Sequence, residues 1–256
     1  MVFRGYMDES YDKERSVCTI SCLIGNGAEW LRLVRDWRDW IDLTNRTLAD
    51  RGLSPISRYH ASDCNAKEGE FKEWPAKLQI DFVCGLFDVL KKRHFHTVSI
   101  SLDWDTFRQA FPRRKYSVRM EEKLAYCYLM IPFLNQIGKE VEKIDANKRV
   151  TLFHDHTDFN GAISDMFWAF KGEPSYKYGP TFVNIAPLEW RDCVALQPAD
   201  MFAFEAMKEI KREEGSPRLS FQAMSLLGLP WKHVHAGKEN ISNSQAKVDA
   251  IVDRDA

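Results

Sequence analysis

The sequence lacks the features that would place it in several specialised classes of protein. Its six cysteines include no C-x-x-C pair and no tight cluster, which argues against a zinc knuckle and a disulfide framework. No uninterrupted apolar run approaches the ~20 residues needed to span a bilayer, and no basic and apolar leader opens the chain. These absences predict a reduced, cytoplasmic protein with no membrane partner.

Phosphate-binding loops and an excess of positive charge are also missing. Gly25-Asn26-Gly27 has too few glycines, at the wrong spacing, for a Walker-type or dinucleotide-binding loop, and there is no G-x-S-x-G elbow. Lysine and arginine number 36 against 37 acids, for a net charge of -1. Any nucleic-acid surface must therefore be local. The local basic runs are 91–93 and 113–115, each of which could equally be a solvated edge.

Length and composition predict one folded unit. The 256 residues are 45% hydrophobic and 29% charged, which is enough to bury a large core, and no linker is visible. We expect a single domain over residues 1–236 and a polar, flexible tail over residues 237–256. The oligomeric state stays open, and Trp190 and Trp231, if exposed, would suit an interface or a lid.

Hydrophobic periodicity predicts alternating strands and helices. A hairpin of strands Val2–Met7 and Ser16–Ile24 opens the chain. Pro132 should kink or divide a long helix, Arg58–Asp63 should be a brief strand or an extended loop, and the chain after Glu213 should be irregular. Further helices are expected near residues 28–50, 75–92, 116–142, 161–170 and 198–211, and further strands near 94–102, 148–153 and 181–185. This order indicates a layered α/β or α+β fold with a mixed sheet.

Acids stand where the predicted strands end. Asp8, Asp103 and Asp155 each end a strand, and Asp200 opens an apolar helical run. One aspartate after a strand is usually a turn or cap residue, but acids on neighbouring strands would converge at one rim. Close carboxylates repel unless a cation lies between them, and Mg²⁺ or Mn²⁺ prefers such oxygen ligands. Two such ions ~4 Å apart would clamp the attacking and leaving oxygens of a phosphodiester.

Four segments together resemble a known family. They are Met7-Asp8-Glu9-Ser10, Tyr59-His60-Ala61-Ser62-Asp63, the strand ending at Asp155, and Leu196-Gln197-Pro198-Ala199-Asp200. They look like landmarks of the bacterial domain-of-unknown-function family 3800, usually placed in the ribonuclease H-like superfamily. The resemblance covers roughly Val2 to Lys211. It implies a ribonuclease H-like mixed central sheet flanked by helices, with the helices between Ala28 and Lys92 as insertions.

The resemblance also implies a metal site. In that superfamily two strand-borne aspartates and one helix-borne aspartate typically bind the metal, and Asp8, Asp155 and Asp200 match these positions. Family members often carry glycine after Asp-Glu-Ser and an acid before the middle histidine, where this chain has Tyr11 and Arg58-Tyr59. Asp103 and Asp63 are the available replacements for that further acidic ligand.

Other polar residues near these acids have supporting roles in this interpretation. His60 could act as a general base or proton shuttle beside the metal. Gln197 could orient Asp200 or its backbone. The candidate catalytic residues are Asp8, Asp155, Asp200 and His60; the candidate metal ligands are Asp8, Asp155, Asp200 and Asp103; the supporting residues are Glu9, Ser10, Asp63 and Gln197.

Two functional alternatives stay open. Three H-x-H pairs, at residues 94–96, 154–156 and 233–235, would place imidazoles on one face of a strand, as zinc ligands often require. The sequence favours a metal-dependent nuclease, or other phosphodiester-processing enzyme, acting on nucleic acid. The alternative is a catalytically inactive binding or regulatory module of a mobile-element or defence system, because a fold alone does not establish activity.

Overall fold

A mixed sheet of six strands forms the centre of the protein. The structure is a computed structural model and describes residues 2–12, 16–110, 118–145, 147–211 and 231–236. The strand order is β5-β4-β1-β2-β3-β6. The strands are β1 (Val2–Tyr11), β2 (Val17–Gly25), β3 (His96–Asp103), β4 (Arg149–Asp155), β5 (Phe182–Leu188) and β6 (Trp231–Ala236).

The sheet combines an antiparallel half with parallel additions. Strands β1, β2 and β3 pair antiparallel in chain order, so the predicted opening hairpin is confirmed. Strand β4 pairs parallel with β1, β5 parallel with β4, and β6 parallel with β3. The carboxyl ends of β1, β3 and β4 therefore lie at the same edge of the sheet, where β3 ends at Asp103 and β4 ends at Asp155.

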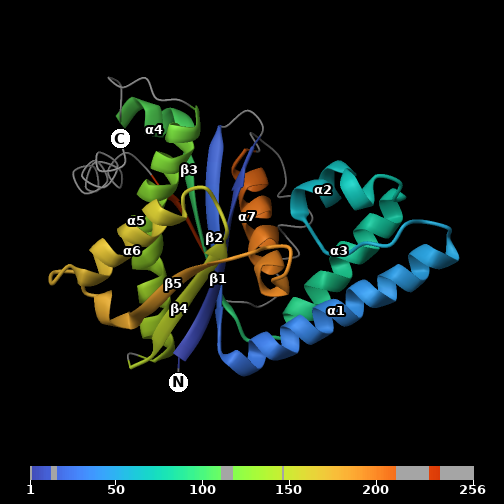
Figure 1. Cartoon of the computed structure of the whole chain (residues 1–256), viewed down its shortest axis with the longest axis horizontal. Coiled ribbons are helices and arrows are strands. Elements are labelled where there is room, and N and C mark those ends of the chain that lie inside the picture. Colours follow the sequence, from blue (N-terminus) through green and yellow to red (C-terminus); the bar gives the residue numbers. More distant parts are fainter. Residues whose placement is uncertain (1, 13–15, 111–117, 146, 212–230, 237–256) are drawn as a thin grey trace.

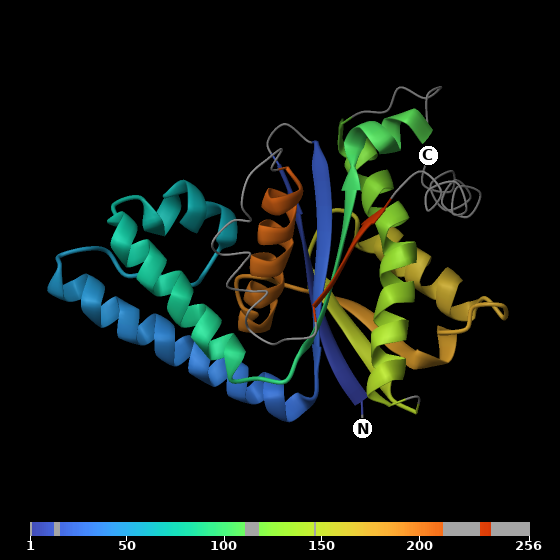
Figure 2. The same cartoon turned by 180° about the vertical axis from the view of Figure 1, so that it is seen from behind.

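Helices cover both faces of the sheet (Figure 1 and Figure 2). Helices α5 (Val118–Ile144) and α6 (Asn160–Gly172) lie on one face, and α7 (Gln197–Ile210) lies on the other. Helices α1 (Gly27–Asp50), α2 (Ala61–Ala66) and α3 (Ala76–Lys91) lie beyond α7, and α4 (Trp104–Ala110) follows β3. Short 3₁₀ turns are η1 (Gly69–Phe71), η2 (Gly179–Thr181) and η3 (Val194–Leu196). The predicted α/β class is thus confirmed.

The central strand β2 shows why the sheet needs two covering layers. All nine of its residues are buried, because alternate side chains pack against α5 on one face and against α7 on the other. The face under α7 carries hydroxyls that pair across strands, with Ser21 Oγ 2.6 Å from Ser99 Oγ and Thr19 Oγ1 2.6 Å from Ser101 Oγ. Each buried hydroxyl in these two pairs has a partner, which removes the cost of burying it.

The helical layer outside α7 is held by large aromatic residues. Helix α1 begins after Asn26, whose side chain accepts the Glu29 N–H at 3.0 Å. Its buried stripe includes Trp30 and Trp37 at helical spacing. Helix α3 approaches α1 at Gly85, where an added Cβ would lie 2.0 Å from the Trp40 ring. The absence of a side chain at Gly85 therefore sets how closely α1 and α3 pack.

Several sequence-based expectations need correction. The segment Arg58–Asp63 is extended only as far as His60, and α2 begins at Ala61; neither the brief strand nor the fully extended loop is right. The chain after Glu213 is not irregular throughout, because residues 231–236 add β6 to the sheet. Helix α4 was not predicted. Helix α5 runs through Pro132 without dividing, so of the two predicted effects of Pro132 only a kink stays a prediction.

Some expectations fall outside the described residues, namely the basic run 113–115 and the tail 237–256. In the other basic run, Lys91 and Lys92 are exposed, whereas the Arg93 guanidinium pairs with Asp36. Within the described part of the chain, no helix is long and apolar enough to cross a membrane.

Candidate functional site

Asp8 and Asp155 lie side by side on the neighbouring strands β1 and β4. Asp155 ends β4 as predicted, but β1 continues past Asp8 to Tyr11, so Asp8 lies within its strand rather than at its end. Strand β4 runs parallel to β1 with Met7 opposite His154, so the next residue on each strand is an aspartate. Two residues earlier on the same face, the rings of Tyr6 and Phe153 stack at 5.0 Å. Adjacent strands lie ~4.8 Å apart, so the register alone brings these two carboxylates together.

The third aspartate comes from the opposite layer. Asp200 lies in the first turn of α7, which begins at Gln197 and has Pro198 among its first two residues. Its Oδ2 accepts the N–H of Ala61 at 2.7 Å, so Asp200 also holds the start of α2. The helix terminus favours the ionised carboxylate.

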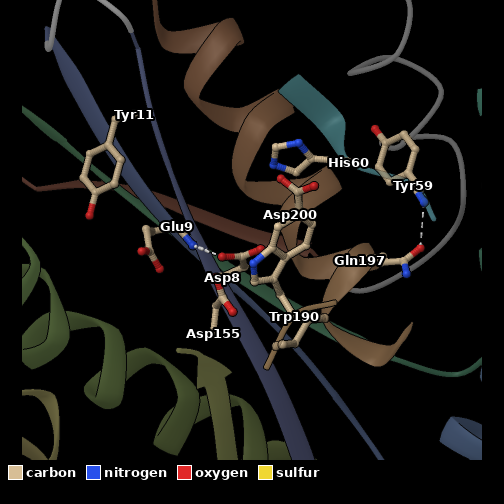
Figure 3. Close-up of a pocket in the computed structure, with 10 residues that line it drawn as sticks. Asp8, Glu9, Tyr11, Tyr59, His60, Asp155, Trp190, Gln197 and Asp200 are labelled. Atoms are coloured by element: carbon tan, nitrogen blue, oxygen red, sulfur yellow. Dashed lines mark hydrogen bonds between the residues drawn. The ribbon is translucent and has the colours of Figure 1, made fainter. Parts of the chain in front are cut away.

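These three acids face one pocket of about 270 Å³ (Figure 3). Its wall combines β1, the end of β4, the start of α7, and the loops before α2 and after β5. The lining residues are Asp8, Glu9, Tyr11, Tyr59, His60, Asp155, Trp190, Leu196, Gln197 and Asp200. None of these lining residues, all in the described part of the chain, is a lysine or an arginine.

Glu9 also lines this pocket, although its side chain points away from that of Asp8, the preceding residue on β1 (Figure 3). Its backbone N–H donates to Asp8 Oδ1 at 2.8 Å. Its Oε2 atom is buried and has no hydrogen-bond partner among the described residues. Burial, together with the charges of Asp155 and Asp200, raises the pKa of Glu9 to about 8. A buried oxygen without a donor is costly unless a proton or a cation neutralises it.

The pKa values of the three aspartates are also raised. Burial, then the charges of Asp200, Glu9 and Asp155, holds the pKa of Asp8 well above its usual value. Burial raises the pKa of Asp200 to about 6, although His60 and the Ala61 N–H act in the opposite direction.

For Asp155, burial outweighs the backbone hydrogen bonds of His156 and Trp190 and raises the pKa. All four pocket carboxyls therefore resist carrying negative charge together, and a bound cation would relieve this.

His60 and Gln197 support the site from the side of α2. The Nδ1 atom of His60 lies 2.9 Å from Asp63 Oδ2, so Asp63 orients the imidazole rather than binding at the centre. Gln197 Oε1 accepts the Trp37 Nε1–H at 2.8 Å and the Tyr59 N–H at 3.1 Å. The sequence suggested that Gln197 could orient Asp200, but neither of these two hydrogen bonds reaches Asp200. Gln197 instead ties α7 to α1 and to the segment that carries His60.

Two predicted site residues lie elsewhere. Asp103 pairs with Val17, whereas Asp8 pairs with Ser21, so Asp103 lies four residues, or ~13 Å, further along the sheet and two strands away. Its Oδ1 accepts the Thr106 N–H at 2.9 Å at the start of α4. The assignment of Asp103 as a ligand is therefore not supported by the geometry. Ser10 follows Glu9 on β1 but does not line the pocket.

One observation favours a divalent cation in this pocket, and another does not. The donors suit the cation, because Asp8, Glu9, Asp155 and Asp200 offer carboxylate oxygens and one buried oxygen lacks a partner. Within the described residues, however, no group of three or more histidine, cysteine, aspartate or glutamate side chains is close enough to hold a metal ion. Binding would need the carboxylates to turn toward one another. For the same reason, the H-x-H pairs do not form a zinc site among the described residues.

Comparison with known proteins adds no relative: no family model, no curated protein and no solved structure matches this chain. The site must therefore be interpreted from its own geometry. Sequence reasoning missed three parts of that geometry, namely the pocket positions of Tyr11, Tyr59 and Leu196. Trp190 was considered only as an interface or lid residue, and its place between β5 and α7 could not be derived from residue spacing.

Proposed function

We propose that this protein is a divalent-metal-dependent enzyme that cleaves phosphodiester bonds of nucleic acid, on a ribonuclease H-like fold. The observation that carries the proposal is the convergence of Asp8, Asp155 and Asp200 from two strands and a helix on one pocket lined by no lysine or arginine. Chains rarely gather buried acids without a neutralising side chain unless the site has a function.

The topology supports the fold part of the proposal. A hairpin opens a mixed sheet, β4 lies parallel beside β1, and helices cover both faces. The two strand-borne aspartates lie on those neighbouring strands, as the sequence resemblance implied. Helices α1 and α3 then correspond to the helical insertion expected between Ala28 and Lys92.

Each pocket residue has a role in this proposal. Asp8, Asp155 and Asp200 would hold Mg²⁺ or Mn²⁺. Glu9 would either coordinate the ion as well or accept a hydrogen bond from a water bound to it. The metal would supply Lewis-acid activation of water and of the phosphate. His60, held by Asp63 at 2.9 Å, is placed to accept the proton that the attacking water loses. Asp200 links the two halves of the site, because it also holds the backbone of Ala61.

The test is cleavage of DNA and RNA, single and double stranded, by wild type and by Asp8→Asn with Mn²⁺ or Mg²⁺. We expect cleavage that needs the metal and falls at least about 1,000-fold in Asp8→Asn. Asp42→Asn, an exposed change on α1, is the matched control and should cleave like wild type. Absence of saturable Mn²⁺ binding in the millimolar range would overturn the proposal.

A binding module without chemistry is the second candidate. It is favoured by the finding that the described carboxylates do not form a ready-made group of three, and by the net charge of -1. On that hypothesis the protein would bind a strand or a metal but cleave none of the four substrates. The cleavage assay therefore separates the two candidates directly.

A further inference from the structure

Trp190 is fixed beside the acids by its backbone and lines the pocket with its side chain. It lies between β5, which ends at Leu188, and η3, which begins at Val194. Its backbone hydrogen bond to the carboxylate of Asp155 lowers the pKa of that group against the effect of burial. The ring is therefore held at the rim of the pocket, next to a proposed metal ligand (Figure 3).

Cationic and aromatic groups surround this ring. The Cζ atom of Arg58 lies over it, 3.8 Å from the ring centroid, and the Cζ of Arg191 lies 5.1 Å away. The His60 ring lies 5.3 Å from it at an interplanar angle of 34°. Arg58 makes no ion pair with an acid in the described part of the chain, so its guanidinium N–H groups remain available to a phosphate.

The chemistry of this rim differs from that of the pocket floor. The floor is acidic, whereas the rim offers an indole ring with the Arg58 guanidinium lying over it and that of Arg191 further from it. An aromatic ring next to arginine is the combination that single-stranded nucleic-acid sites use, because a base stacks on the ring while the cation contacts the backbone. Bases inside a duplex cannot offer a face to such a ring unless they leave the stack.

We propose that an unpaired base next to the scissile phosphate stacks on Trp190 in place of the Arg58 guanidinium, which moves from the ring to the strand's backbone, so that the substrate is single-stranded nucleic acid. The proposal rests on the proposed function, because it places the phosphate of that strand at the acidic floor. It assigns recognition to Trp190 and Arg58, and it leaves metal binding to Asp8, Asp155 and Asp200.

The test measures the affinity of full-length protein for fluorescein-labelled strands of about 12 nucleotides in Ca²⁺, by anisotropy. Three probes share one sequence: single-stranded DNA, single-stranded RNA and blunt duplex DNA. We expect Trp190→Leu to weaken single-strand binding about 5- to 100-fold, Trp190→Phe to keep it within about threefold, and Arg58→Gln to weaken it and flatten its salt dependence. Duplex binding should be weaker and unaffected by Trp190→Leu. The DNA and RNA arms identify which strand is preferred.

The chain provides a matched control. Trp168, on α6, is 47% exposed and has Lys171 Nζ 5.0 Å from its ring centroid, but it does not line the pocket. Trp168→Leu should therefore bind every probe like wild type. Equal single-strand affinity for Trp190→Leu and wild type, or duplex binding tighter than single-strand binding, would overturn the inference.

Mn²⁺ titration by calorimetry on the same variants separates this inference from the proposed function. Trp190→Leu should keep wild-type metal affinity, because the change leaves its backbone N–H in place and removes no carboxylate. If wild type binds Mn²⁺ but single-strand binding ignores Trp190, only the stacking inference fails. If no variant binds Mn²⁺ yet strand binding still depends on Trp190, the proposed catalysis fails and the stacking site stands.

Discussion

Two groups of carboxylates on the first hairpin show opposite behaviour. Asp12, buried at the turn after β1, accepts the N–H groups of Ser16 and Val17 at 2.6 and 2.8 Å, and Lys211 Nζ lies 2.6 Å from its Oδ2. Burial alone would raise its pKa, but these partners lower it below the usual value. Only three and four residues earlier, burial and neighbouring acids raise the pKa of Glu9 and Asp8.

Partners, not burial, account for the opposite pKa shifts of Asp12 and of the two pocket acids. Asp12 closes the hairpin, and its charge is neutralised within the chain by Lys211. Glu9 has a buried oxygen without a partner in the described residues, and Asp8 has three acids as electrostatic neighbours. A fold optimised for stability alone would not keep such a cluster. The cluster is therefore the best place to look for an external cation.

The largest expected difference between the two groups is in metal affinity. Asp8→Asn removes one ligand of the proposed centre and should weaken Mn²⁺ binding at least about 100-fold, as losing an inner ligand does. Asp12→Asn should leave Mn²⁺ affinity within about threefold of wild type. Isothermal titration calorimetry measures both. Equal losses in the two variants would show that the comparison does not separate structure from function.

Stability should respond to the same two substitutions with opposite signs. Asp12→Asn removes the carboxylate charge that pairs with Lys211 Nζ at 2.6 Å and should lower the free energy of unfolding by about 1–3 kcal/mol. Asp8→Asn removes repulsion among the pocket carboxylates and should raise the free energy of unfolding of the metal-free protein by about 0.5–1.5 kcal/mol. Urea unfolding in EDTA gives both values. Destabilisation by Asp8→Asn would indicate that Asp8 is a structural acid like Asp12.

The pH dependence of stability should also differ between the groups. Because burial raises the pKa of Glu9 from 4.5 to about 8 and that of Asp200 from 3.8 to about 6, the folded state keeps protons that the unfolded state has released. For each such proton, the free energy of unfolding falls by ~1.4 kcal/mol per pH unit as the pH rises from the unfolded pKa to the folded pKa. The pKa values of His154 and His233, which burial lowers to about 4, act in the opposite direction up to the unfolded value of 6.5. The melting temperature in EDTA should therefore fall most clearly from about pH 6.5 to pH 8.

Two variants check the origin of this slope. Glu9→Gln should flatten the decrease, because it removes a group whose pKa is raised from 4.5 to about 8 in the folded state. Asp12 has a lowered pKa, so its contribution is present above the unfolded value of 3.8 and is lost only as pH falls through its folded pKa. Asp12→Asn should leave the slope above about pH 5 unchanged. A melting temperature that rises toward pH 8 in wild type would contradict the assignment.

The smallest expected effect comes from Asp63, at the outer edge of the site. Its pair with His60 is partly exposed, with side-chain exposures of 34% for His60 and 37% for Asp63. Asp63→Asn should therefore change stability by less than about 0.5 kcal/mol. If the pair orients the proton acceptor, cleavage should still fall several-fold at saturating substrate. A cleavage rate equal to that of wild type would remove Asp63 from the site.

Local chemistry in the sequence was enough to predict part of the fold and of the site. Alternating and helical apolar patterns located β1, β2, α1 and α7, and the acids at predicted strand ends and at the start of a predicted helix pointed to Asp8, Asp155 and Asp200. Asp103 showed the same local pattern but caps α4, because a strand's register and position in the sheet depend on distant pairing. That information is not present in the residues around Asp103.

Three other features could not be predicted from the sequence, because they also depend on distant parts of the chain. Helix α2 begins at Ala61, whose N–H donates to Asp200, a residue 139 positions away in the sequence. The residues around Ala61 therefore carry no local capping signal that would predict the start of this helix. Strand β6 is a short element paired with β3 at the edge of the sheet, and its H-x-H pattern suggested a metal site instead. The position of Trp190 at the pocket rim depends on how β5 and α7 meet, which only the folded structure provides.

The central claim is that Asp8, Asp155 and Asp200 share one cation site, and paired thermal melts in EDTA and in Mn²⁺ test it most directly. Asp8→Asn, Asp155→Asn and Asp200→Asn should each melt above wild type in EDTA by about 1–4 °C and lose most of the upward shift that Mn²⁺ gives wild type. Asp42→Asn should match wild type in both conditions. If the three variants melt like Asp42→Asn with and without Mn²⁺, the carboxylates do not form a site.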